Sequence, residues 1–157
     1  MTTRLGLTLT AILGLASLMA PAPAAAQDAG VTGAAEAAFP NGAAFNGVSL
    51  KGLTLGQGMY IAQDGSATGQ FQAVLLGTSP LGTPQNVTVE GEVGGGSVGA
   101  DGSATFSGTA TIDMGDGTPA LPGVPFTVTA SAGSLGLILN AVALPTATVT
   151  AGSITTK

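Results

Sequence analysis

The sequence predicts an all-β protein: an antiparallel β-sandwich, immunoglobulin-like or jelly-roll-like, of about nine strands. Three observations predict this fold. Apolar and polar residues alternate with a period of two, as in half-buried strands. The turn formers Gly and Pro, 26 and 9 of the 157 residues, interrupt this alternation at short intervals. Charged residues make up only 7%, so threonine and serine must supply the polar strand faces.

An internal repeat organises the chain. Residues 64–68 read Asp-Gly-Ser-Ala-Thr, and the same five letters return at 101–105, an offset of 37 residues. Without any gap, this offset carries apolar positions onto apolar positions across residues 57–93 and 94–130. We interpret the two segments as copies of one hairpin unit.

One pair of positions is exchanged between the copies. Gly69 and Phe71 correspond to Phe106 and Gly108, so each copy keeps one ring and one glycine on the same strand face. Each Asp-Gly pair is expected to form a tight type I′ hairpin turn, because both central residues of that turn need positive φ.

The remaining strands follow from local patterns. The apolar residues occupy even positions before Lys51-Gly52 and odd positions after it, and this change predicts a β-bulge. The proline-containing segments 77–85 and 115–123 are predicted loops, because proline cannot donate to a sheet. In residues 135–142 both the odd and the even positions include apolar residues, so both faces of a strand would be apolar. This pattern indicates a central strand covered on both faces. A last strand is expected at about residues 147–155.

The N-terminus has the pattern of a secretory signal. Arg4 precedes the apolar run 5–20, and small residues follow at Ala24 and Ala26. We therefore expect a signal peptide over residues 1–26 and export to the periplasm, the cell surface or the medium of a bacterium.

Two further segments complete the expected domain organisation. Residues 27–45 are rich in Ala and Gly without a period and are expected to be a flexible lead-in. Residues 46–157 are expected to form a single sandwich domain. An outer-membrane barrel is the alternative architecture, but its aromatic girdles would need more than the six aromatic residues present.

The composition excludes several classes of function. The chain has no Cys and no His, so thiol nucleophiles, Ser-His pairs and imidazole metal sites cannot form. Removal of the signal leaves two lysines against eight acidic residues, a balance that argues against binding of nucleic acid. After signal removal no segment is expected to span a membrane.

One Asp-Gly segment is a candidate calcium site. Asp113 and Asp116, separated by Met and Gly and followed by Gly117, could bind calcium through carboxylate and carbonyl oxygens. Residues 112–117 resemble the Asp-x-Gly-Asp-Gly motif of polycystic-kidney-disease-type sandwich domains. This resemblance covers six residues, lacks the family's flanking aromatic residues and His-x-Tyr, and implies no membership. The simpler interpretation is a plain turn.

Two other patterns have a structural interpretation that we prefer. Residues 94–96 are glycines, and with Gly99 and Asp101 they approximate a calcium-binding nonapeptide whose spacing is off by one. Glu90 and Glu92 lie two residues apart on a predicted strand, about 6.6 Å by strand rise, as on a solvated face. Catalytic carboxylates of glycosidases, by contrast, flank a cleft.

The sequence thus favours an exported, non-enzymatic structural or interaction module, able to self-associate through sheet edges and needing no cofactor. A module that binds calcium or carbohydrate is the second hypothesis. An enzyme that uses carboxylates alone is a remote third.

Overall fold

The computed structural model describes residues 28–157, which form ten antiparallel strands and no helix. The strands are β1 (Ala29–Ala38), β2 (Ala44–Phe45), β3 (Val48–Ile61), β4 (Ser66–Thr78), β5 (Val87–Val98), β6 (Ala104–Asp113), β7 (Leu121–Ala130), β8 (Ser134–Leu139), β9 (Val142–Ala143) and β10 (Ala147–Thr156). The predicted all-β antiparallel class is confirmed. The expected signal peptide, residues 1–26, lies outside the described residues. In the part described, no helix has the length and apolar character needed to cross a membrane.

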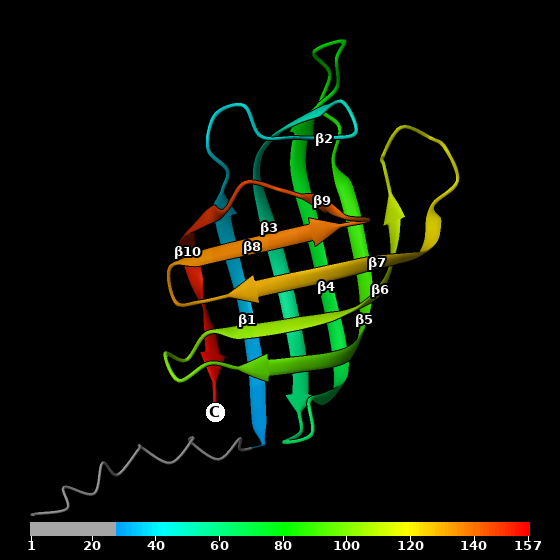
Figure 1. Cartoon of the computed structure of the whole chain (residues 1–157). Helices are drawn as coiled ribbons and strands as arrows, with labels where there is room; N and C mark the ends of the chain where they lie inside the picture. The colour runs from blue at the N-terminus through cyan, green and yellow to red at the C-terminus, as the bar shows by residue number, and fades with distance from the viewer. Residues whose placement is uncertain (1–27) are drawn as a thin grey trace, which may run out of the picture.

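The sheet closes on itself. Strand β1 pairs with β10 on one edge and with β3 on the other, and every intervening neighbour is paired in chain order. The two-residue strands β2 and β9 are additions to this ring. Hydrogen bonding is therefore continuous around one sheet and is not divided between the two sheets of the expected sandwich. Figure 1 shows how the ring is flattened: β7 and β8 cross steeply over β1, β3 and β4.

The expectation of a flexible lead-in at residues 27–45 is wrong. Most of this segment is β1, which is paired over ten positions with β3 and over eight with β10. Val31, Ala35 and Ala37 point into the core. Small residues hid the alternation, because Ala and Gly occupy both faces of the strand and the apolar contrast is low.

Bulges let the long strands bend from one layer to the other. The register between β3 and β4 shifts between Leu50 and Gly52, which confirms the predicted bulge. A second shift lies between Val93 and Gly95, within the three consecutive glycines of β5. Strand β5 changes direction strongly along its length (Figure 1). Glycine suits such a bend because it has no side chain to pack.

The core is built from the inward faces of all the long strands. Three phenylalanines lie at its centre: the ring of Phe71 is stacked 5.4 Å from that of Phe126 and tilted 5.7 Å from that of Phe106. All three are almost fully buried. Such pairs add to the free energy of folding beyond the area they bury, by about 0.5 to 1.5 kcal/mol each.

Glycines make room for these rings. A Cβ atom at Gly91 would lie 2.6 Å from Cε1 of Phe126, and one at Gly108 would lie 3.1 Å from the same atom and overlap the carbonyl of Glu92. Phe71 and Phe106 are buried, and Gly69 and Gly108 on the same strands are half-buried. Gly91 and Gly108 make room for Phe126, whereas a Cβ atom at Gly69 would overlap the backbone of Gly58 and Met59.

The Asp-Gly turns differ from the predicted type I′ turns. Gly65 has a φ of 83° and Gly102 a φ of 78°, but neither Asp64 nor Asp101 has positive φ. The Gly65 N–H donates to the Ala62 carbonyl at 3.0 Å, so the loop is a type I turn followed by a glycine bulge.

The true type I′ turns lie elsewhere. Asn46 and Gly47 have φ values of 47° and 85° and join β2 to β3. Asn140 and Ala141, at 48° and 64°, join β8 to β9. Asn-Gly is the strongest short hairpin signal in a sequence, and the sequence analysis missed it at residues 46–47.

Strand β8 also differs from its prediction. Leu135, Leu137 and Leu139 are buried, whereas Ile138 is 41% exposed, so only one face of the strand is covered. Residues 147–156 form the expected last strand.

One polar side chain is buried in the core. Gln57 on β3 is 9% exposed, and within the described residues neither its Nε2 nor its Oε1 has a hydrogen-bond partner. In the sheet it lies between Gly33 and Phe71, two inward positions that offer it no polar side chain. An unsatisfied buried amide lowers the stability of the folded state.

Replacing Gln57 by methionine should therefore stabilise the protein. Methionine has a similar length and no unmet hydrogen bond, so we expect Gln57→Met to raise the free energy of unfolding by about 1 to 3 kcal/mol. Urea titration followed by circular dichroism measures this. The exposed Gln70 on β4 is the control, because Gln70→Met should change stability by less than about 0.5 kcal/mol. Equal effects at both positions would contradict the explanation.

Candidate functional site

A polar hollow lies on the outer face of β4, β5 and β6. Outward side chains of these strands form two rows across the sheet. In one row Glu90 faces Gln72 on one side and Thr111 on the other. In the second row Glu92 faces Gln70 and Thr109, and we call the whole surface the outer trough.

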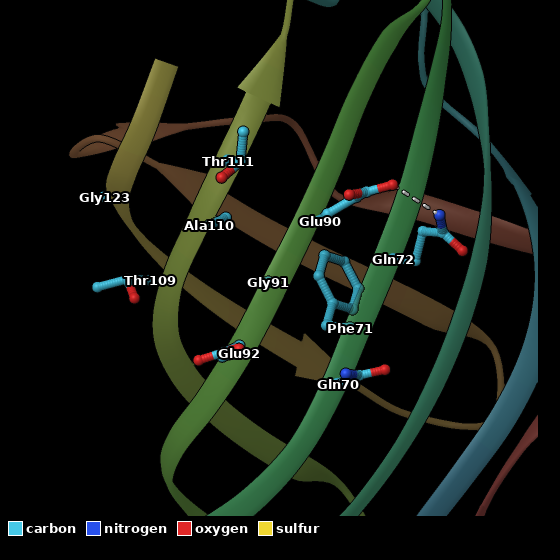
Figure 2. A pocket seen from close by; sticks show the side chains of 10 residues that line it. All are labelled: Gln70, Phe71, Gln72, Glu90, Gly91, Glu92, Thr109, Ala110, Thr111 and Gly123. Carbon is cyan, nitrogen blue, oxygen red and sulfur yellow. Dashed lines mark hydrogen bonds between the residues drawn. The ribbon is translucent and has the colours of Figure 1, made fainter. Parts of the chain in front are cut away.

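The outer trough has a volume of about 510 Å³ and is open to solvent. Its lining residues are Gln70, Phe71, Gln72, Glu90, Gly91, Glu92, Thr109, Ala110, Thr111 and Gly123. Figure 2 shows the two glutamates along β5, with the glutamines of β4 on one side and the threonines of β6 on the other. Nε2 of Gln72 donates a hydrogen bond of 3.2 Å to Oε1 of Glu90.

The pleat of the sheet explains this arrangement. Residues 70, 72, 90 and 92 are outward positions, while Phe71 and Gly91 between them face the core. Gly91 carries no side chain because Phe126 occupies the space beneath it. The floor of the trough is therefore backbone, and its polar side chains stand around that floor.

The trough can accept more hydrogen bonds than it can donate. Two carboxylates lie on neighbouring outward positions of one strand, and no salt bridge to either is present among residues 28–157. The amide of Gln70 and the hydroxyls of Thr109 and Thr111 supply donors beside them. Such a surface suits a ligand with several hydroxyl or N–H groups.

The same geometry argues against acid–base catalysis of glycoside hydrolysis. Glu90 and Glu92 come from one strand and one face, as the sequence predicted. A glycosidase places its two carboxyl groups on opposite sides of the scissile bond. No cleft separates this pair.

Asp113 and Asp116, the candidate calcium ligands, each accept hydrogen bonds from residues two positions ahead. Asp113 ends β6, and its Oδ1 accepts a hydrogen bond of 2.8 Å from the Gly115 N–H. Oδ1 of Asp116, in the loop before β7, accepts from the N–H and the hydroxyl of Thr118 at 2.9 and 2.6 Å. Each carboxylate thus holds its own turn, and the described residues contain no group of three or more acidic side chains placed to bind a metal.

The two repeated aspartates have the same local role. Oδ1 of Asp64 accepts from the N–H and hydroxyl of Ser66 at 2.9 and 2.6 Å. Oδ1 of Asp101 accepts from Ser103 at 3.0 and 2.6 Å. Asp101 is therefore engaged in its turn, and the glycines at 94–96 serve the bend in β5.

These hydrogen bonds shift the acidity of three carboxyl groups. The hydroxyl of Ser66, and after it the backbone N–H, hold the pKa of Asp64 below its ordinary value. Ser103 lowers the pKa of Asp101 in the same way. Thr118 lowers the pKa of Asp116, again through its hydroxyl first. All three groups are exposed, so each shift reflects hydrogen bonding rather than burial.

The glutamate pair is visible in the sequence, but the glutamines beside it are not. Gln70 and Gln72 on β4 belong to the trough only because β4 pairs with β5 in this register. Thr109 and Thr111 join the trough in the same way, through the register of β5 against β6. Which strand lies beside which is a property of the whole sheet, and no local pattern carried it.

The three lowered pKa values predict a dependence of stability on pH. A carboxyl group whose pKa is lower in the folded state stabilises the fold above its ordinary pKa of 3.8, and this contribution is lost as the pH falls through the lower value. We therefore expect the melting temperature to decrease below about pH 4. Asparagine keeps the turns but does not titrate. The melting temperature of the triple variant D64N/D101N/D116N should therefore decrease less on acidification than that of the wild type.

Thermal melts from about pH 2 to 7 measure this difference. Removing the side-chain donors instead, in the variant S66A/S103A/T118V, should also flatten the acid limb because the carboxyl groups would return toward ordinary pKa values. If the melting temperature of both variants fell below pH 4 as steeply as that of the wild type, the three aspartates would not be the cause of the decrease.

Comparisons of the chain with known protein families, with curated proteins and with solved structures find no match. A proposal of function therefore has to come from the geometry and chemistry of the chain itself.

Proposed function

We propose that this protein is an exported, non-enzymatic structural or interaction module of the bacterial cell exterior. The observation that supports the proposal is the distribution of polar and charged side chains between the interior and the surface. Apolar side chains fill the interior of the closed sheet, and within residues 28–157 the buried side chains other than Gln57 are hydrophobic. The carboxylates lie on the outside: four aspartates accept hydrogen bonds in turns or loops, Glu90 and Glu92 line the outer trough, Asp28 accepts from Tyr60 and Gln63, and Glu36 is exposed on β1. Such a distribution suits contact with a partner more than conversion of an enclosed substrate.

Closure of the sheet restricts how copies could pair through their edges. Among residues 28–157, strand β10 pairs with β8 only at Ala147 and Thr148, so residues 150–155 have no strand partner on the side away from β1. At the end of β10 the Thr156 hydroxyl donates to the Gly102 carbonyl at 3.1 Å. The stretch 150–155 carries no charged residue that would block an approaching strand. A register shift opposite Thr150 and the positive φ of Gly152 make its first part irregular. Edge pairing would therefore use the end of β10.

The proposal predicts assembly of the exported chain. Size-exclusion chromatography with light scattering should give a mass above that of one chain, rising with concentration, and the protein should be recovered with the cell-surface fraction. Far-ultraviolet circular dichroism is the control that the associating species is folded. A freely soluble species that stays monomeric and binds no cell-surface component would contradict the proposal.

A second candidate function is binding of a carbohydrate or of calcium. The outer trough favours the carbohydrate, because carboxylate, amide and hydroxyl groups in two rows match the hydroxyl pattern of an extended glycan. Asp113 and Asp116 remain the candidates for calcium. A carboxylate-only enzyme stays the remote third possibility, with Glu90 and Glu92 as its residues.

Titration with soluble glycans separates these two ligands. Carbohydrate binding should weaken at least tenfold in the variant E92Q/T109V, while D113N/D116N, which leaves the trough intact, should bind as the wild type does. Calcium at ~10⁻⁴ to 10⁻³ M should raise the melting temperature of the wild type but not of D113N/D116N. An unchanged melt would exclude calcium, and equal glycan affinity of both variants would exclude the trough.

A further inference from the structure

The last residues of β10 are held in the sheet by one strand, β1. We call residues 150–157 the C-terminal arm. In the part of the chain that the structure describes, β8 pairs with β10 only at Ala147 and Thr148, before the arm begins, whereas β1 pairs with the arm at six positions. Figure 1 shows this red end of β10 running beside the blue strand β1. One further hydrogen bond joins the Thr156 hydroxyl to the Gly102 carbonyl at 3.1 Å. The arm therefore depends on β1 for its place in the fold.

The arm contributes little to the core. None of its residues is fully buried. Of its hydrophobic side chains, Ile154 packs partly against the core, while Ala151 is exposed. The anchor of β10 is Ala147, which is fully buried before the arm begins. Segments with few buried contacts open at a lower free energy than the core does. The arm can therefore leave its own sheet while the core stays packed.

A β-bulge separates the arm from the rest of β10. Glu36 on β1 lies opposite Ala151, but the next residue, Ala37, lies opposite Val149, so Thr150 has no partner residue on β1. The Thr150 hydroxyl donates to the Glu36 carbonyl at 3.2 Å. An extra residue of this kind interrupts the ladder and bends the strand that contains it. Thr150 is thus the position at which the chain can turn away from β1 while Val149 stays paired.

The edge of β1 fits this arm closely. Gly30 and Lys157 exchange two backbone hydrogen bonds of 2.9 Å at the end of the pairing. A Cβ atom at Gly152 would overlap the backbone of β1, and one at Gly33 would lie 2.7 Å from the Ser153 carbonyl oxygen. Main-chain hydrogen bonds supply the affinity when a strand is added to the edge of a sheet. A second copy presents the same edge and the same glycines, so its β1 can accept the arm in the same register.

The charge of the arm favours contact with a second copy. Residues 28–157 carry two lysines and eight acidic residues, so two copies repel one another where carboxylates meet. The arm has no acidic side chain, and its last residue, Lys157, is one of the two lysines. The segment that would enter the second copy is therefore positive, whereas the copy that receives it is acidic.

We propose that the C-terminal arm of one copy pairs with β1 of a second copy, in place of that copy's own arm. The inference rests on the proposed structural function and gives its self-association a contact between defined strands. Eight extended residues reach about 25 Å, far enough to pass from one copy to the next. The tether keeps each arm at an effective concentration of millimolar order beside its own β1, so exchange becomes visible only as the protein approaches about 1 mM.

Two cysteine pairs distinguish this exchange from association at the free edge of β10, in which each arm stays on its own β1. The chain has no cysteine of its own. In T32C/T155C the new cysteines lie opposite each other on β1 and the arm, at a separation that a disulfide can span. The control T32C/G58C links β1 to β3, and position 58 has open space for a side chain.

Oxidation of T32C/T155C in dilute solution should lock each arm onto its own β1. The locked protein should stay monomeric in sedimentation equilibrium up to about 1 mM, and reduction should restore an average mass that rises with concentration. Oxidation of the concentrated, reduced protein should instead give covalent dimers and larger species on non-reducing gels. The oxidised control should associate as the wild type does, because its disulfide leaves the arm free.

Melting temperatures of the reduced variants that equal that of the wild type show that both are folded. If T32C/T155C melts lower, A34C/S153C places the same lock at another pair of exposed, opposite positions.

Three results would overturn the inference. Association of the locked protein at wild-type strength would overturn it while leaving assembly through the free edge of β10 intact, since the lock does not cover that edge. Disulfides confined to single chains in the concentrated protein would overturn it in the same way. A wild type that is monomeric at every concentration would overturn both arm exchange and self-assembly as the proposed function.

Discussion

The packing of Phe126 over two glycines is the contact on which the rest of the structure depends. Gly91 on β5 and Gly108 on β6 let the backbones of two neighbouring strands approach one ring on β7. Without side chains at these positions, the strands can fold over the phenylalanine cluster and the ring of strands can close. The outer side of the same backbone is the floor of the outer trough. Gly91 therefore both makes room for Phe126 in the core and forms part of the floor of the outer trough.

Local physics made much of the fold predictable. The alternation along β6 and the bulge after Leu50 depend on neighbouring residues, and the structure contains both of them. The duplication of the unit stays a prediction. Closure was not predictable, because it depends on β1, whose alanines and glycines give little apolar contrast, and on pairing between the two ends of the chain. The glutamate pair was visible from spacing, whereas the glutamines beside it required the register of β4 against β5.

Five of the eight acidic residues fall into two groups with different hydrogen-bonding surroundings. Asp64, Asp101 and Asp116 are engaged by a hydroxyl and an N–H two residues ahead, so their charge serves the turns that contain them. Glu90 and Glu92 stand on the open face of β5, where glutamine and threonine surround them. In the carbohydrate-binding alternative proposed above, the second group would contact the ligand.

The pairing of β1 with β10 fixes the order in which this protein can fold. β1 can pair with β3 as soon as residues 48–61 are available, but its other partner is the last strand of the chain. Contacts so distant in sequence form slowly. A chain that emerges from its N-terminus must therefore hold the alanine-rich edge of β1 open until residues 148–156 arrive. During that interval the edge is accessible to chaperones, to proteases and to the same edge of another chain.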